Sequence, residues 1–287
     1  MTAMFVTTKT VDAVNHMRAY EAAFGSCHHF AFNHDAIRND HLILEAAEKA
    51  KPKAIFYIGA CRARGNPNIE TLKALRRIAP TINVCSDAAD GPWHGPLKAY
   101  RLHECFGLQV SIDGAIDAPV DLATLTPVDV RAFEGRVEKD IRFGFSGSVG
   151  RWNERSEVVG ALAWFGGLTI RAREGEGTYE DHARFMQRCR MILNISFTGT
   201  GHAHHVKGRV LEAGWAGCCL LESAGSPIGQ WFPDDCYLTY GDPVEAAEIA
   251  RTIDDTTIER TARRLSEEVR ARFHPSTIYG EMLEKCG

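Results

Sequence analysis

Residues Met191–Glu222, MILNISFTGTGHAHHVKGRVLEAGWAGCCLLE, contain the pattern that decides the fold. The apolar run at residues 191–197 is short and is bounded by Thr and Gly, which predicts a buried strand. A polar loop rich in Gly and His follows, and from Val206 to Gly217 apolar residues recur at helical spacing. Residues 218–221 are apolar again and predict the next strand. This order is the βαβ unit of a parallel sheet, which binds ligands beyond the carboxyl ends of its strands.

The start of this predicted helix carries groups that suit a phosphate. Unpaired N–H groups and the positive end of the helix dipole lie there, and Lys207 and Arg209 add two cations. Glu212 follows on the same helix face as Arg209, where its two oxygens could accept hydrogen bonds from a sugar or ribose diol. The alternative is a solvated Arg–Glu pair on an ordinary surface helix, because short motifs also match by chance.

Strands and helices alternate along the whole chain, which predicts an α/β fold. We expect strands at residues 4–7, 28–32, 54–59, 81–85, 108–112, 141–146, 168–172, 191–197 and 218–221. We expect helices at residues 11–24, 40–51, 68–78, 97–106, 178–190, 206–217, 245–253 and 256–273, and another that opens at Asn153. Residues 118–140 interrupt this order with prolines and mixed charges. We therefore predict a linker there, and two domains, 1–135 and 136–287.

Composition and charge are ordinary for a globular protein. With 287 residues the chain is long enough for two cores, and 45% of it is hydrophobic. The formal net charge of −4 argues against general coating of nucleic acid. Nine cysteines without a CxxC pair are expected to be reduced core thiols, which favours a cytoplasmic location. We expect no signal peptide, and no apolar run reaches the roughly 20 residues that cross a bilayer.

The segment KGRVLEAGWAGCCLLE, residues 207–222, resembles the nucleotide-sugar half of GT-B glycosyltransferases, in particular the CgeB-like, GT4-related group. The resemblance continues at Phe-Pro-Asp-Asp 232–235, at Tyr-Gly-Asp 240–242 and upstream at Phe-Gly-Phe-Ser-Gly-Ser 143–148. It covers residues 140–262 well and the first half of the chain loosely. GT4 enzymes usually carry two Glu residues eight positions apart. Here Glu212 matches the second of them, and His204 stands in the place of the first.

This resemblance implies two Rossmann-like parallel-sheet domains that face a cleft, with the donor in the second domain. It also implies that the terminal helix crosses back to the first domain. The implied enzyme is a hexosyltransferase that moves a sugar from a nucleotide-diphosphate sugar, with UDP as the nucleotide, to a hydroxyl acceptor. The residues expected to bind the donor are Gly147, Ser148, Arg151, Arg155, Arg173, Glu174, His204, Lys207, Arg209 and Glu212.

Each of two further segments has a functional interpretation and a purely structural one. The Gly-rich turn at residues 144–150 is neither a GxGxxG nor a Walker motif, yet it lets backbone N–H groups approach a phosphate. Its alternative is a tight turn without a ligand. Asp87 and His94 follow a strand end in the first domain, where either could deprotonate an acceptor hydroxyl. Their surroundings, Asp-Gly-Pro and His-Gly-Pro, are also common turn sequences.

No cofactor or metal ion is expected. The clusters at residues 27–29 and 202–205 contain Cys and His, but neither shows the paired ligand spacing of a zinc site. The alternatives to a transferase are a GT-B-type epimerase or phosphorylase and a non-catalytic nucleotide- or sugar-binding module. The donor sugar and the acceptor stay open, and the net charge gives no indication of a nucleic-acid acceptor.

Overall fold

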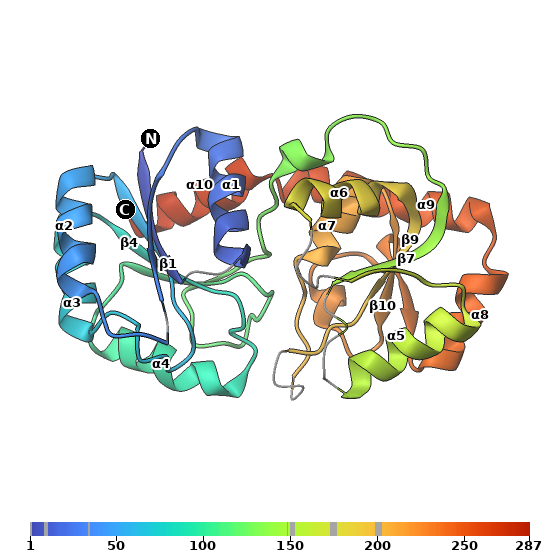
Figure 1. Ribbon diagram of the computed structural model, residues 1–287, viewed down its shortest axis with the longest axis horizontal. Coiled ribbons are helices and arrows are strands. Elements are labelled where there is room, and N and C mark those ends of the chain that lie inside the picture. Colours follow the sequence, from blue (N-terminus) through green and yellow to red (C-terminus); the bar gives the residue numbers. More distant parts are fainter. Residues whose placement is uncertain are drawn as a thin grey trace. The chain divides into compact units, whose positions relative to one another are not determined.

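A computed structural model describes residues 2–8, 11–33, 35–147, 149, 153–172, 177–198 and 203–287. Contacts between Cα atoms divide the chain into two compact units. Residues 1–129 and 275–287 form the first unit, and residues 130–274 form the second. In each unit a parallel sheet has helices on both of its faces (Figure 1). The alternation of strands and helices predicts this α/β structure, and two Rossmann-like parallel-sheet units are what the family resemblance implies.

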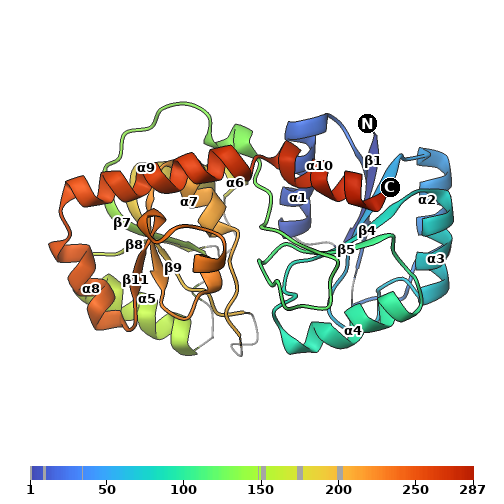
Figure 2. The same cartoon turned by 180° about the vertical axis from the view of Figure 1, so that it is seen from behind.

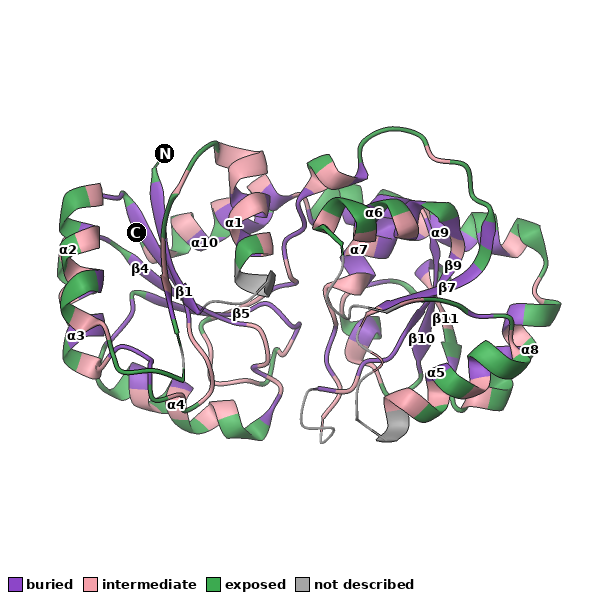
Figure 3. Ribbon diagram, in the orientation of Figure 1, coloured by how far each residue is buried: buried purple, intermediate pink, exposed green. Residues whose placement is uncertain are grey.

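The sheet of the first unit has the strand order β2-β1-β3-β4-β5-β6, and its pairings are parallel. Its strands are β1 (Ala3–Thr8), β2 (His28–Phe32), β3 (Ala54–Ile58), β4 (Thr81–Cys85), β5 (Leu108–Ser111) and β6 (Leu122–Ala123). Strands β1, β3, β4 and β5 are buried along their whole length, as Figure 3 shows in purple. This burial is expected where helices cover both faces of a parallel sheet.

The helices of the first unit are α1 (Val11–Phe24), α2 (Asp40–Ala50), α3 (Ile69–Ile78), α4 (Gly91–Leu102) and α10 (Pro275–Cys286). Helices α2 and α3 pack together on one face of the sheet, and α1 packs against α10 on the other (Figures 1 and 2). The aromatic rings of Phe5, Tyr20, Phe56 and Tyr279 contact one another beneath α1 and α10. These contacts explain why the end of the chain belongs to the first unit.

The sheet of the second unit has the order β11-β10-β9-β7-β8, again with parallel pairings. Its strands are β7 (Ile141–Gly147), β8 (Thr169–Ala172), β9 (Cys189–Asn194), β10 (Cys219–Ser223) and β11 (Leu238–Tyr240). The helices are α5 (Asn153–Phe165), α6 (Tyr179–Arg188), α7 (Arg209–Ala216), α8 (Pro243–Thr252) and α9 (Asp255–Arg272), with short 3₁₀ turns at Val130–Phe133, Pro227–Gln230 and Asp234–Cys236. The central strand β9 lies between β7 and β10, so the predicted βαβ unit forms the middle of this sheet.

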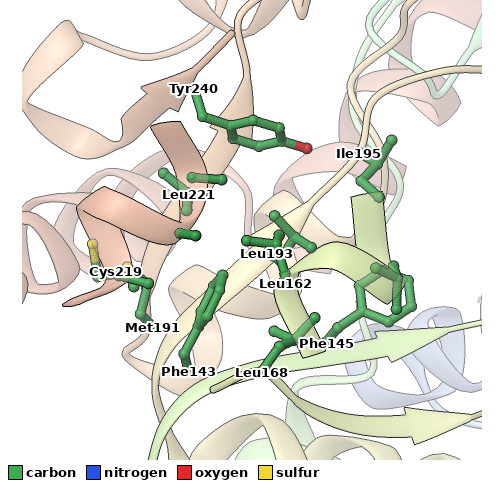
Figure 4. Packing of buried hydrophobic residues seen from close by; sticks show 14 of the residues in the cluster. Phe143, Phe145, Leu162, Leu168, Met191, Leu193, Ile195, Cys219, Leu221 and Tyr240 are labelled. Atoms are coloured by element: carbon green, nitrogen blue, oxygen red, sulfur yellow. The ribbon is translucent and has the colours of Figure 1, made fainter. Parts of the chain in front are cut away.

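Apolar side chains from β7, β9 and β10 fill the core of the second unit. Phe143, Phe145, Met191, Leu193 and Leu221 are buried there, and Figure 4 shows them facing one another. Helices α5 and α8 close this side of the sheet. The core fixes the carboxyl ends of the three strands relative to one another, and these ends carry the polar groups described below.

The largest differences from the prediction concern four elements. The helix expected at residues 97–106 begins at Gly91 and ends at Leu102, because Pro92 fits the first turn, where its missing N–H is not needed. The strand expected at 191–197 is Cys189–Asn194, and the following helix begins only at Arg209, so the loop between them is longer. The prediction had no helix after residue 273. Pro275 disfavours helical backbone at His274, which ends α9 there and lets α10 begin separately.

Candidate active site

Polar side chains from six elements meet at the carboxyl ends of β7, β9 and β10 in the second unit. The elements are these strand ends, the loop after β9, the start of α7 and the first turn of α6. Helix α6 is fixed by a capping box, in which Thr178 and Asp181 bond to each other's backbone N–H. The capping box places Tyr179 and His182 in the first turn. The sheet edge predicted to bind a ligand therefore carries a cluster of charged and hydrogen-bonding groups.

Arg209 joins three of these elements. Its Nη1 donates to Asn194 Oδ1 at 3.0 Å, and its Nη2 donates to the backbone oxygen of Ser146. The guanidinium also lies 5.1 Å from the ring centre of Phe145. Gly147 is necessary here, because a Cβ at this position would lie 2.5 Å from Arg209 Nη2. Arg209 thus holds the ends of β7 and β9 against α7.

Glu212 is held by two side chains of α6. His182 Nε2 lies 3.0 Å from one carboxylate oxygen, and the Tyr179 hydroxyl donates to the other at 3.0 Å. Burial by itself raises the pKa of Glu212, but the charge and hydrogen bond of His182, with Arg209 and Tyr179, lower this pKa to about 2. His182 Nδ1 lies 2.8 Å from Ser146 Oγ. A continuous chain of hydrogen bonds therefore connects Glu212 to the end of β7.

A second carboxyl group lies deeper, at the end of β10. Glu222 is fully buried and accepts a hydrogen bond of 2.7 Å from Asn194 Nδ2. Burial raises the pKa of Glu222 to about 7, although the hydrogen bond from Asn194 and the charge of Arg209 act in the opposite direction. Asn194 consequently connects Arg209 on one side to Glu222 on the other.

The loop after β9 folds back on itself. Phe197 and His204 form an antiparallel bridge, and Thr198 N donates to Ala203 O at 2.8 Å. Ser196 Oγ lies 2.6 Å from His204 Nδ1 and 2.7 Å from Ser223 Oγ, which ties this loop to the end of β10. The predicted donor-binding His204 therefore lies beside the strand end that is adjacent to the cluster.

Lys207 contacts a buried histidine. Its Nζ lies 2.6 Å from Nε2 of His205, which is 5% exposed. Since an ammonium group can only donate, His205 accepts this bond through an unprotonated Nε2. The ammonium charge of Lys207 is thereby held at the loop that leads into α7.

The structure brings five of the predicted donor residues to this edge, namely Gly147, His204, Lys207, Arg209 and Glu212. Arg155 lies in α5, and burial lowers its pKa. Ser148, Arg151, Arg173 and Glu174 lie outside the described residues.

Sequence reasoning missed several members of the cluster, namely Ser146, Tyr179, His182, Asn194 and Glu222. Asn194 ends β9, and Glu222 is the second-last residue of β10. Asn194 lies inside the strand predicted at 191–197, whereas Glu222 directly follows the strand predicted at 218–221, so only Glu222 stands at a predicted strand end. Tyr179 and His182 are spaced for one helix face, but nothing in their own segment shows that this face meets Glu212.

The predicted catalytic residues of the first unit follow β4. Asp87 is half-buried, and its carbonyl accepts from Asp90 N at 3.0 Å. His94 lies in α4, where its Nε2 is 3.1 Å from the carbonyl oxygen of Ala88. Asp113, at the end of β5, is buried and accepts from Ser111 Oγ and Ala89 N. These bonds hold the turn after β4 in place.

The described residues contain neither a cluster of metal ligands nor a membrane-spanning helix. No group of three or more His, Cys, Asp or Glu side chains in this part of the chain is arranged to hold a metal ion. None of the helices described is long and apolar enough to span a membrane.

Solved structures with the same two-unit fold are glycosyltransferases. HepE of Anabaena, solved with UDP and glucose, is similar with a TM-score of 0.65 and 12% identity, over 99% of this chain and 98% of that one. Sucrose-phosphate synthase of Thermosynechococcus elongatus has a TM-score of 0.59 and 10% identity, over 99% of both chains. AviGT4, a glycosyltransferase of avilamycin A biosynthesis, has a TM-score of 0.56 and 14% identity, over 100% and 98%. The fold is GT-B.

The family follows from a sequence match that covers the second unit and most of α10. Residues 130–284, more than half of the chain, match the family described as glycosyl transferase-like. No curated protein matches. The chain belongs to this glycosyltransferase family. It is an enzyme that transfers a sugar.

Proposed function

We propose that the second unit binds a UDP-sugar at the carboxyl ends of β7, β9 and β10, and that transfer to a hydroxyl acceptor needs no metal ion. The observation that carries this proposal is the cluster around Arg209 and Glu212, at the edge where parallel sheets bind ligands. HepE, which shares the fold, was solved both with UDP and with UDP-glucose.

Glu212 suits the ribose of the nucleotide. With a pKa of about 2 it is ionised at neutral pH, and a carboxylate offers about four lone-pair sites. Tyr179 and His182 take one bond on each oxygen. The remaining capacity is enough for the two ribose hydroxyls. His182 acts here as a positioning residue, because it fixes the carboxylate without being needed on the sugar itself.

Cations and backbone groups around α7 suit the diphosphate. The leaving group needs its negative charge stabilised as the glycosidic bond to the donor breaks. Lys207 and the N–H groups at the start of α7 supply this stabilisation, while Arg209 keeps the surrounding strand ends in position. We include Ser148, Arg151, Arg155, Arg173 and Glu174 in the donor site on the strength of the family resemblance.

Asp87 is our proposed general base for the acceptor hydroxyl, with His94 as the second choice. Asp87 follows β4 and is half-buried, not fully buried. We also propose a cytoplasmic location, since the nine cysteines are free thiols in the structure.

A panel of nucleotide sugars tests this function. Calorimetry with UDP and with uridine should show UDP binding more tightly, because the diphosphate supplies charge contacts. Release of UDP that depends on an added acceptor identifies a transferase. UDP binding without turnover on any acceptor would indicate a binding module, and a sugar 1-phosphate formed from added phosphate would indicate a phosphorylase.

A further inference from the structure

A cavity of ≈ 610 Å³ lies in the first unit at the end of β3. It is formed by the loop before α2, by the loop between β3 and α3, and by α4. This edge corresponds to the carboxyl ends of β2 and β3, which is where α/β sheets bind ligands. The donor site described above lies in the other unit and uses none of these residues.

Two arginines line this cavity, Arg38 and Arg62, and both are exposed. Within the part of the chain that the structure describes, neither guanidinium forms an ion pair with a carboxylate. The one acid in the lining, Glu70, lies 3.6 Å from Lys73 instead. The cavity therefore presents two guanidinium groups whose charge is available to a ligand.

The backbone around Arg62 is fixed in an uncommon conformation. Arg62 has φ 53°, in the left-handed region that non-glycine residues seldom adopt. Asn66 holds this loop closed by bonding through its side chain to both the N–H and the carbonyl of Ala60. Such strain persists only where the surroundings enforce it, and it concentrates at ligand sites. Here the enforced conformation directs Arg62 toward the cavity.

The cavity lies close to the proposed general base. A Cβ on Gly95 would be 3.7 Å from Arg62 Nη2, so the guanidinium lies against α4 at Gly95, the residue after His94. The carboxylates of Asp87 and Asp90 are near enough to raise the pKa of the neighbouring Cys61, after burial and against the charge of Arg62. Arg62 and the turn after β4 thus belong to one local surface of the first unit.

We propose that this cavity binds the phosphate group of a small phosphorylated molecule through Arg38 and Arg62. A phosphate monoester carries nearly two charges and three acceptor oxygens at neutral pH, which match two guanidinium groups. This inference rests on the proposed function: the molecule is the acceptor of the sugar. Its phosphate binds the two arginines, and its reacting hydroxyl lies toward Asp87.

The experiment is calorimetry of the full chain with glycerol 3-phosphate, at constant ionic strength, with and without saturating UDP. Saturation with UDP keeps the probe out of the donor site. The variants are Arg38→Gln and Arg62→Asn, since Asn tolerates left-handed backbone. Arg64→Gln is the matched control, because Arg64 is exposed two residues from Arg62 but does not line the cavity. Glycerol and glycerate serve as neutral and carboxylate probes.

We expect the Kd of glycerol 3-phosphate to rise about tenfold or more in Arg38→Gln and in Arg62→Asn, and to stay within about twofold in Arg64→Gln. Glycerol should not bind, and glycerate should bind more weakly. The proposal would be overturned if Arg64→Gln lost as much affinity for glycerol 3-phosphate as the cavity variants, or if glycerol bound as tightly as glycerol 3-phosphate.

UDP binding, measured on the same samples, separates this inference from the proposed function and also reports folding of the variants. If the protein binds UDP but does not bind glycerol 3-phosphate, the phosphate site is contradicted and the proposed donor site is not. The protein could instead bind glycerol 3-phosphate, lose this binding in the cavity variants, and fail to bind UDP. That result would support the phosphate site and contradict the proposed donor site.

Discussion

The charged side chains at the two sheet edges differ in whether they already have partners within the protein. In the second unit Arg209 and Glu212 are already bonded to protein groups, and Lys207 contacts His205. In the first unit Arg38 and Arg62 carry no carboxylate partner among the described residues. A preorganised network holds its geometry before the ligand arrives and costs little reorganisation. Unpaired cations instead depend on the ligand for their counter-charge. Substitutions in the two units should therefore change different quantities.

The largest expected effect is on turnover, from the first unit. Asp87→Asn should lower kcat by about 10²–10⁴-fold, because a general base contributes on that scale, and should leave the Kd of UDP unchanged. Steady-state kinetics and calorimetry on the same preparation measure both. If Asp87→Asn and His94→Gln each leave kcat within about threefold, the first unit does not supply the base.

The second effect is on stability, from the second unit. Arg209→Met should lower the free energy of unfolding by about 3 kcal/mol, because Asn194 and the Ser146 carbonyl lose bonds to a charged donor. The free energy of unfolding of Arg209→Lys should lie between those of wild type and Arg209→Met, since an ammonium group cannot form the two-pronged hydrogen bonding of the guanidinium. Urea unfolding measures this, and Arg62→Asn is the counterpart in the other unit. If Arg62→Asn lowered the free energy of unfolding as much as Arg209→Met, the two sheet edges would not differ in how far their arginines stabilise the fold.

The third effect concerns pH and the buried Glu222. Its folded pKa of about 7 lies above the ordinary value of 4.5, so the folded state binds the proton more tightly than the unfolded state. The stabilisation is fully present below pH 4.5 and is lost as pH rises through 7, by up to about 3 kcal/mol. Glu222→Gln should remove this dependence. Urea unfolding at pH 5 and pH 8 tests it, and a pH dependence unchanged in Glu222→Gln would assign the titration to another group.

The fourth effect is on donor affinity. Glu212→Ala should weaken UDP binding by about 1.5–3 kcal/mol, the range for hydrogen bonds to a charged group. Removal of a negative charge next to Arg209 would by itself strengthen binding of an anion, so the two interpretations differ in sign. Calorimetry with UDP decides between them. Binding as tight as wild type would place the ribose elsewhere.

The smallest effect should come from removal of metal ions. We expect EDTA to leave acceptor-dependent UDP release unchanged, because Lys207 and the start of α7 meet the charge of the diphosphate. The control is an assay with added Mg²⁺ or Mn²⁺. Loss of turnover in EDTA that either ion restores would show that the diphosphate needs a metal.

Several features of the fold were predictable because they depend on local patterns. The strand at 54–58 and the helix at 40–50 follow from apolar runs and spacing. The helix at 91–102 was predicted to begin too late, because Pro92 and Pro96 suggested turns. Pro92 lies in the first helical turn, which accepts proline, and Pro96 lies inside the helix. Helix α10 was missed, since its place depends on rings such as Tyr279 packing against Tyr20, far away in the sequence.

The sequence by itself determined that a βαβ unit carries Lys207, Arg209 and Glu212 beyond the carboxyl end of a strand, because hydrophobic period and chain order fix which strand end a loop follows. Only the tertiary structure decided what these residues touch. His182 reaches Glu212 from α6, and Asn194 connects Arg209 to Glu222. Likewise, Arg38 and Arg62 meet at one cavity although different loops carry them. The physical reason is that hydrogen bonds and charges depend on distance in space, and packing of the sheet sets that distance between segments that share no local pattern.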